Sequence, residues 1–436
     1  MFASAIIIGT VLLSLPLAAE SGRVSPIDAL FTATSAVCVT GLTVVNTGVT
    51  FSRFGEVVVL ILIQLGGLGL MIFSTLFFLA LGGRISLGQR MTLSETFGAD
   101  SGINSNTILR SVFILTFIME AAGTIILYFP FSSRMGPLEA LYSALFHSVS
   151  AFCNAGFSIF SNGLSEYQLS AVTLLAMAAL IIVGGLGFSV VSELSGRLRK
   201  TGDRKPWSLQ TKIVLTATGA LLLGGGAVYF FLEKGNALSG YPLHLKIIHS
   251  FFESATSRTA GFDPINQTSF SNISLLFTVF LMIIGGSPGS TAGGIKTTSF
   301  VIIMAAIVSR LRGSQGVNIF KRTVGTETVI KAVSIFVLAA MVIFAATMIL
   351  MLVESNFAPH KIGKEIALDY FFETVSAFGT VGLSLGITSG LGAAGKFVLI
   401  LVMFTGRVGL LTMAYAIARA EGTDRIVYSE ENVMIG

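Results

Sequence analysis

The sequence predicts an all-α integral membrane protein, built from four parallel repeats around a pseudo-fourfold axis. Of its 436 residues, 53% are hydrophobic and only 11% are charged, which is too apolar for a water-soluble globule of this size. One motif occurs four times. Each copy lies between two long apolar stretches. We therefore expect each repeat to consist of a span, a pore loop with its short helix, and a second span, giving eight membrane spans and four re-entrant pore helices.

The repeated motif begins with an aromatic residue and ends ten residues later on a glycine that Leu or Phe follows. Its copies read FTATSAVCVTG, FHSVSAFCNAG, FFESATSRTAG and FETVSAFGTVG. The first half favours a helix, and the second half favours a short extended segment ending on a residue free to adopt positive φ.

Four such segments around one axis place four sets of backbone carbonyls on a common centre, which is the chemistry of a cation selectivity filter. The alternative interpretation is that the glycines serve only as turn residues in re-entrant loops. The candidate filter residues are Val39, Thr40, Gly41, Asn154, Ala155, Gly156, Thr259, Ala260, Gly261, Thr380, Val381 and Gly382.

The apolar stretches are long enough to cross a bilayer core of about 30 Å at about 1.5 Å per residue. Stretch 2–19 also resembles a signal-peptide core, but no Lys or Arg precedes it, and we interpret it as a retained first span. The other first spans are expected at 108–129, 213–232 and 329–353, and the second spans at 54–81, 169–194, 273–311 and 395–418. The repeats are then 1–81, 108–194, 213–311 and 329–418, followed by a cytoplasmic tail, 419–436.

A proline lies at or just before each re-entrant helix, and Ser25-Pro26 is typical of an N-cap followed by the first helical position. Each short helix should end near the filter with its negative dipole end toward the ion. Basic residues gather in loops 195–212 and 309–328. This asymmetry predicts a plasma (inner) membrane protein with cytoplasmic termini and outward-facing filters. The four prolines are Pro26, Pro137, Pro242 and Pro359.

The third repeat departs from the pattern. Its apolar run 273–284 is too short to span, and a glycine-rich stretch follows it. Irregular backbone persists at membrane depth only where it lines water or is buried in protein, so we expect this stretch to lie under the filter as a movable barrier. A phosphate-binding loop is excluded because Ile295 separates the last glycine from the lysine and no strand precedes it. The candidate gate residues are Gly285, Gly286, Ser287, Pro288, Gly289, Ser290, Thr291, Ala292, Gly293, Gly294, Lys296 and Arg407.

Small residues near the membrane centre keep more than one interpretation open. Cys38 and Cys153 each precede a filter glycine by three residues, and small buried side chains are favoured there over a disulfide or a metal site. Glycines near the middle of the second spans either keep a central pathway open or let helices approach closely. These glycines are Gly67, Gly185, Gly286 and Gly406.

Charged residues at membrane depth require partners. Arg258 either repels surplus cations or braces the filter through acceptors such as Glu253 or Glu373, and bracing is favoured because a bare positive charge would block the ion path. Lys296 and Arg407 form an electrostatic gate that swings aside, or else extend toward the inner interface.

Other polar residues favour structural roles. Glu120 is a proton or sodium site or, as we favour, an acceptor of hydrogen bonds from a neighbouring pore helix. His147, His244 and His249 favour packing or mouth positions, since no metal-ligand spacing appears. No catalytic constellation or basic aromatic surface module is visible, so we expect no enzyme, no organic cofactor and no nucleic-acid partner.

Six short motifs carry a family resemblance: VCVTGL, FCNAGF, SRTAGF, GTVGL, the loop ending GGIKT, and TGRVGLLT. Together they resemble the bacterial Trk/Ktr/HKT superfamily of potassium transporters, and within it the KtrB type of membrane subunit. The resemblance implies uptake of K⁺, often dependent on or stimulated by Na⁺. It also implies a homodimer in membrane lipid, docked on a cytosolic KtrA-like nucleotide-binding ring.

The same resemblance implies residue roles. Loop 285–294 gates and Arg407 contacts it, while Pro288 departs from the small residue usual at its place. Glycine at all four ion-site positions favours potassium. Those positions are Gly41, Gly156, Gly261 and Gly382. The alternatives are a gradient-coupled symporter that uses Glu120 and a non-transporting membrane scaffold.

Overall fold

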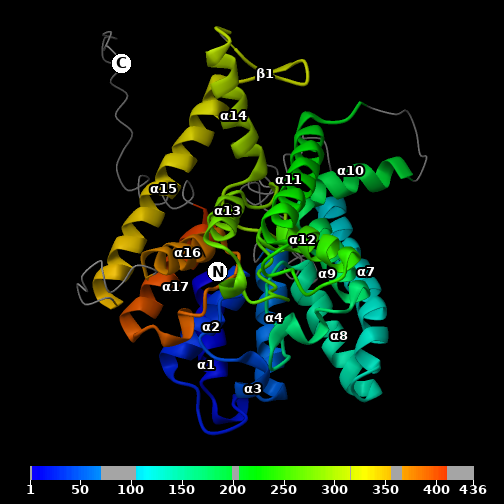
Figure 1. Ribbon diagram of the computed structural model, residues 1–436, viewed down its shortest axis with the longest axis vertical. Helices are drawn as coiled ribbons and strands as arrows, with labels where there is room; N and C mark the ends of the chain where they lie inside the picture. The colour runs from blue at the N-terminus through cyan, green and yellow to red at the C-terminus, as the bar shows by residue number, and fades with distance from the viewer. Residues whose placement is uncertain (1, 70–104, 199–205, 315, 355–365, 410–436) are drawn as a thin grey trace.

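The computed structural model describes residues 2–69, 105–198, 206–314, 316–354 and 366–409, and this part of the chain is mostly helical (Figure 1). The helices are α1 (Phe2–Leu13), α2 (Pro26–Cys38), α3 (Thr47–Thr50), α4 (Arg53–Leu68), α7 (Ser105–Ser132), α8 (Pro137–Phe152), α9 (Ala171–Leu186), α10 (Phe188–Leu198), α11 (Leu209–Glu233), α12 (Leu243–Thr256), α13 (Asn272–Ile283), α14 (Thr297–Leu311), α15 (Thr326–Glu354), α16 (Ile366–Gly379) and α17 (Ala393–Val408).

One antiparallel hairpin joins α14 to α15, at one end of the molecule (Figure 1). It pairs β1 (Val317–Ile319) with β2 (Arg322–Val324) through a two-residue turn in which both residues have positive φ, as a type I′ turn requires. Short 3₁₀ turns complete the described secondary structure at Pro16–Ala18, Gly163–Tyr167, Gln267–Ser269 and Thr388–Gly390.

Three of the expected first spans are long apolar helices. Ser111–Ser132, Leu209–Glu233 and Thr326–Glu354 have the length and hydropathy to cross a membrane. Their outer faces expose large apolar side chains such as Phe117 and Phe344, which suit a lipid environment. The expected span 2–19 is helical only to Leu13, because Pro16 lacks the N–H that a continuing helix needs.

The short helices α2, α8, α12 and α16 begin where the re-entrant segments were expected. Ser25 caps α2 by accepting a hydrogen bond from the Asp28 N–H at 3.2 Å, and Pro26 is its first residue, as predicted. Pro137 likewise opens α8, and Pro242 precedes α12. Pro359 lies outside the described residues.

The helices after the repeated motif end earlier than expected. α4, α9 and α17 each stop at a glycine with positive φ, a conformation that ends a right-handed helix. The expected span 169–194 is therefore not continuous, and after Gly187 the chain turns by 102° into α10. Residues 70–81 and 410–418 of two other expected spans lie outside the described residues.

The third repeat is broken where the sequence predicted it. α13 ends at Ile283 and α14 begins at Thr297. The ends of the intervening stretch are tied together, because the Gly285 N–H donates to the Ile295 carbonyl (2.8 Å) and the Thr297 N–H to the Gly286 carbonyl (3.0 Å). The stretch is thus a closed loop with fixed ends.

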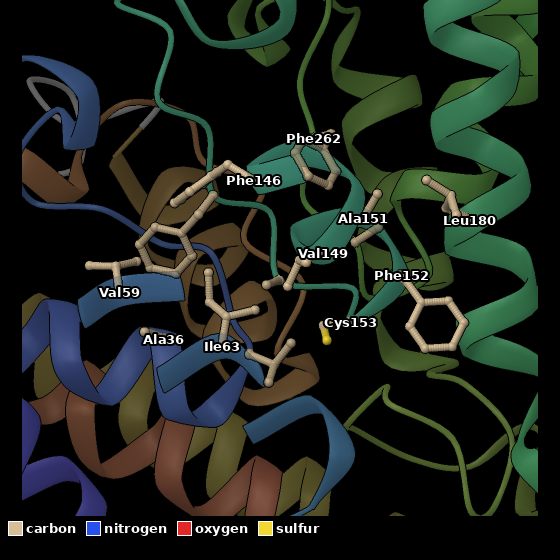
Figure 2. Packing of buried hydrophobic residues seen from close by; sticks show 14 of the residues in the cluster. Ala36, Val59, Ile63, Phe146, Val149, Ala151, Phe152, Cys153, Leu180 and Phe262 are labelled. Carbon is tan, nitrogen blue, oxygen red and sulfur yellow. The ribbon is translucent and has the colours of Figure 1, made fainter. Parts of the chain in front are cut away.

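Each helix after a motif packs against the short helix of the next copy. α4 contacts α8, α9 contacts α12, α13 contacts α16, and α17 returns to contact α2. Figure 2 shows the first of these joints, where Val59 and Ile63 of α4 lie among Ala36, Phe146 and Val149. The order closes on itself, and the ends of the four short helices are brought toward one centre.

Candidate functional site

Two left-handed residues shape each segment after a short helix. The motif glycines have φ between 71° and 95°, as their sequence pattern predicted. A non-glycine residue two positions earlier also has positive φ, which sequence reasoning missed because β-branched side chains disfavour it. The sign of φ therefore alternates along each segment, which lets successive carbonyls face the same side. These residues are Val39, Asn154, Thr259 and Thr380.

Backbone N–H groups in the segments point back at their own helices. The Thr40 and Val381 N–H groups donate to the carbonyls of Ser35 (2.8 Å) and Ser376 (2.9 Å), and Ala155 and Ala260 behave alike. In the described part of the chain, no hydrogen bond ends on a carbonyl oxygen of the twelve candidate filter residues. Their acceptor capacity is left for another partner.

The four motif glycines form a closed ring. A Cβ built on Gly41 would lie 2.6 Å from the carbonyl oxygen of Ala155, and one on Gly156 would lie 2.8 Å from that of Ala260. Gly261 stands in the same relation to Val381, and Gly382 to Thr40. Each glycine thus lies against the carbonyl of the next copy, where no side chain has room.

A vestibule of about 530 Å³ opens beyond this ring. The residues two positions after the glycines line it. In the first, second and fourth copies this residue carries a hydroxyl group. In the third copy it is Asp263, the only charged side chain in the described lining. Sequence reasoning missed Asp263, although the signal was present in the comparison of the copies. The four residues are Thr43, Ser158, Asp263 and Ser384.

Buried polar side chains of the short helices form hydrogen bonds to residues that line the vestibule, and we call these lining residues the outer layer. His147 Nε2 lies 2.8 Å from Ser158 Oγ, and Glu373 accepts hydrogen bonds from the Ser384 and Thr388 hydroxyls. The interpretation of His147 as a packing and mouth residue agrees with these contacts. His249 contacts the Gln168 carbonyl (2.9 Å), and His244 is exposed at the start of α12.

Arg258 does not have the partners expected for it. Its Nη2 donates to Thr297 Oγ1 at 3.3 Å, at the start of α14, and no hydrogen bond or ion pair to Glu253 or Glu373 occurs within the described residues. The physical reason is that both carboxylates are occupied on the opposite side of the filter, by Gln267 and by the hydroxyls already described. Arg258 is 8% exposed and braces the broken helix rather than the outer layer.

Loop 285–296 lies directly beneath the fourth segment and the second repeat. A Cβ on Gly294 would lie 3.2 Å from Gly379, and Gly293 faces Thr380. Thr291 Oγ1 accepts a hydrogen bond from Asn154 Nδ2 (3.1 Å) and donates one to the Phe152 carbonyl (3.2 Å). The loop is therefore in contact with filter residues of two different copies.

Two buried cations attach to the same loop. Arg407 donates to the carbonyls of Thr291 and Gly66, joining the loop to the end of α4. Lys296 Nζ donates to the Ala292 carbonyl at 2.8 Å, within the loop itself. Both cations thus donate hydrogen bonds to backbone carbonyls of the loop.

Three glycines near the ends of α4, α9 and α17 allow close packing against a short helix. A Cβ on Gly66, Gly184 or Gly406 would overlap a carbonyl at the end of the preceding short helix. Of the four glycines singled out in the sequence, Gly406 belongs to this set, whereas a Cβ on Gly185 would have only Asn154 Nδ2 within 4 Å, at 3.6 Å. Gly67 lies against the side chain of Cys153.

Other expected residues lie behind the ring. Cys38 and Cys153 are buried and free, and the Cys153 thiol lies 3.6 Å from Gln64 Oε1. The Glu120 carbonyl accepts a hydrogen bond from Ser148 of α8 (2.7 Å). Its carboxyl Oε1 is buried without a partner in the described residues.

Comparisons with known proteins agree with this architecture. The TrkH family model, described as a cation transport protein, matches residues 3–427. The Ktr system potassium uptake protein B of Vibrio alginolyticus is 38% identical over 100% of this chain and 93% of its own. The potassium/sodium uptake protein NtpJ of Enterococcus hirae is 36% identical over 99% and 94%. The crystal structure of the potassium transporter TrkH from Vibrio parahaemolyticus has a TM-score of 0.72 at 18% identity, covering 95% of this chain and 84% of that one.

Proposed function

We propose that this chain, which belongs to the TrkH family of cation transport proteins, takes up potassium across the plasma membrane. Relatives named as potassium uptake proteins match nearly its whole length. The observation that carries the proposal is the ring of glycines with its uncommitted carbonyls. Transporters, not enzymes, are the relatives of this chain.

In this proposal, the carbonyls of the twelve filter residues replace the hydration shell of K⁺. The back-pointing N–H groups keep the carbonyl ends toward the centre. The four short helices end at the ring, where their partial negative charges favour a cation. Buried hydroxyl oxygens of Thr40, Thr259 and Thr380, which have no partner among the described residues, add further acceptors close to the path.

Loop 285–294, with Lys296 and Arg407, is proposed as the gate on the inner side of the filter. Its hydrogen bonds to Asn154 and Arg407 hold it across the exit of the ring. Opening requires these bonds to exchange for others, since a buried carbonyl or guanidinium left without a partner is costly. A cytosolic regulator that pulls on α14 would supply that exchange.

The wider organisation is proposed from the family. Four parallel repeats give eight spans and four re-entrant helices, with the filter outward and both termini in the cytoplasm. The printed name of the Ktr system relatives supports further subunits, which we propose are a second copy of this chain and a cytosolic nucleotide-binding ring. The name of NtpJ supports a role for sodium, as a stimulating or transported ion.

Glu120 supports a second candidate, a cation symporter driven by a proton or sodium gradient. Its carboxyl group is 4% exposed and its Oε1 has no partner in the described residues, as a transient ion site would require. Glu120→Gln separates the two functions. A symporter loses its dependence on the driving gradient, whereas a filter-based pathway retains potassium uptake.

The test of the proposed function is flux into proteoliposomes in which potassium, sodium and proton gradients are varied separately. The purified protein should take up potassium along its own gradient. Gly261→Ser places a side chain against the Val381 carbonyl and should lower uptake and the preference for potassium over sodium. The matched control is Gly224→Ser in α11, whose Cβ meets nothing within 4 Å. Unchanged kinetics and ion preference in Gly261→Ser would count against the proposal.

A further inference from the structure

Asp263 places a carboxyl group at the mouth of the ring. It lies two residues after Gly261, in the lining of the vestibule described above. The corresponding residues of the other copies are Thr43, Ser158 and Ser384, which are neutral. The third copy therefore gives the vestibule a charge that the other three do not have.

Hydrogen bonds from Gln267 orient the Asp263 carboxylate. The Gln267 backbone N–H donates to its Oδ2 (3.3 Å), and the Gln267 side chain donates to its Oδ1 (3.2 Å). No Lys or Arg in the described residues pairs with it within 4 Å, unlike Asp28 and Glu56, which have such partners. Its charge is oriented but not neutralised.

A second carboxyl group stands behind the first. Gln267 Nε2 also donates to Glu253 Oε2 (3.2 Å), so one amide group bridges the two acids. Glu253 is 1% exposed, whereas Asp263 is only half-buried and borders the open vestibule. Because a charge is far less costly where water reaches it, Asp263 is the member of the pair better placed to carry the negative charge.

We propose that Asp263 is an affinity-determining residue for the external cation, a carboxylate that draws hydrated potassium to the entrance of the filter. The inference rests on the proposed function and adds the step before dehydration. A focused negative charge at the mouth of a narrow pathway raises the local concentration of monovalent cations. The same oxygens favour hard divalent cations, which should compete for the entrance without passing the ring.

Removing the charge of Asp263 should lower the apparent affinity for external potassium and leave the maximal rate of uptake unchanged. Asp263→Asn keeps the shape of the side chain, and Asp263→Ser installs the type of residue found in two other copies. Both should raise the KM for external potassium about fivefold at low ionic strength, from the attraction between unit charges a few Å apart in water. The shift should shrink near 0.15 M salt, where the Debye length is about 8 Å. Inhibition by external Mg²⁺ or Ca²⁺ should weaken in parallel.

The experiment measures rubidium or potassium uptake by the full-length protein, with an impermeant salt to set ionic strength. Asp263→Glu retains the charge and should retain the salt dependence, so a loss of activity from misfolding is distinguished from a loss of attraction. Glu20→Gln, an exposed carboxylate between α1 and α2 outside the vestibule lining, is the matched control and should leave KM unchanged.

Three results would overturn the inference: an unchanged KM in both neutral variants, a fall in maximal rate with unchanged KM, or an equal shift in Glu20→Gln. The wild-type protein tests the proposed function in the same assay. A wild type that takes up no potassium overturns both proposals, whereas normal wild-type uptake with unaltered variants removes only this one.

Discussion

The outer and inner levels of the molecule use the four copies differently. At the outer level, each copy ends its short helix in the same alternating backbone, and each motif glycine lies against the next. At the inner level, the helix that follows the motif ends at a glycine in the first, second and fourth copies. Only the third copy inserts the loop 285–296 there. The outer level is thus nearly the same in all four copies, whereas the inner level differs in the third copy.

This difference follows from what each level has to do in the proposed mechanism. A ring of carbonyls surrounds an ion evenly only if every copy supplies the same backbone, so side-chain identity there is constrained by space. A barrier needs one mobile element and a partner that holds it. Arg407, from the fourth copy, reaches the loop of the third and the helix end of the first. The contrast predicts large effects in the ring and graded effects elsewhere.

The largest effect is expected from Gly382→Ala. Its Cβ would overlap the Thr40 carbonyl, and the glycine has a φ of 95°, which an alanine disfavours. Potassium uptake should fall about tenfold or more, since strain of this kind costs about 1–3 kcal/mol. Gly22→Ala is the control, because Gly22 also has positive φ (76°) but faces open space. Equal losses in the two variants would remove the ring from the explanation.

Loosening the loop 285–294 should raise potassium flux, whereas a substitution in the ring lowers it. Arg407→Ala, or a deletion within residues 285–294, removes the contacts that hold the loop, and potassium flux should rise severalfold with less dependence on a regulator. Electrophysiology or proteoliposome flux with matched protein amounts measures this. A flux no higher than wild type, with normal expression, would contradict the role of the loop as a barrier.

A smaller effect should come from the layer outside the ring. Glu373→Ala leaves Ser384 and Thr388 without their shared acceptor, so the fourth segment loosens and potassium-over-sodium preference should fall about two- to tenfold, the loss of one or two hydrogen bonds. Thr32 occupies the equivalent place in the first copy, and its hydroxyl has no partner within the described residues. Thr32→Ala should therefore leave ion preference unchanged, and an equal loss there would reject the explanation.

The smallest effect concerns the joints between copies. Asp28 and Lys396 pair at 2.7 Å with 18% and 13% of their side chains exposed, and they join the last copy to the first. The Arg53–Glu139 pair joins the first to the second at 3.4 Å but is more than half exposed. A double-mutant cycle on thermal unfolding should give a coupling of about 1 kcal/mol for the first pair and near zero for the second. The reverse order would show that burial does not decide the strength of these joints.

Sequence reasoning reached the ring because the determinants are local and repeated. A glycine ten residues after an aromatic, four times, predicted positive φ at the four positions, and the break in the third copy followed from its short apolar run. The expected partners of Arg258 were wrong, and Gly406 corresponds to Gly66 rather than to Gly67, because both features depend on which side of a helix faces its neighbour across the ring. Positive φ at Val39, Thr259 and Thr380 had no signal at all, because only tertiary packing holds a β-branched residue there.

The bend at Gly187 shows the same limit. The run 169–194 is mostly apolar, and its composition favours one continuous span. The chain instead turns where the Phe188 N–H donates to the Gly289 carbonyl of the third copy (2.9 Å). The helix ends at Gly187, whose positive φ is shared by the ends of α4 and α17, and a contact with a residue about a hundred positions away accompanies the turn.

The most direct test of the central claim is anomalous diffraction from crystals grown with rubidium or thallium in place of potassium. If the ring is a selectivity filter, a dehydrated ion should lie on its axis, within about 3 Å of carbonyl oxygens from all four copies. Ordered ions found only beside acidic side chains, with none inside the ring of Gly41, Gly156, Gly261 and Gly382, would contradict it.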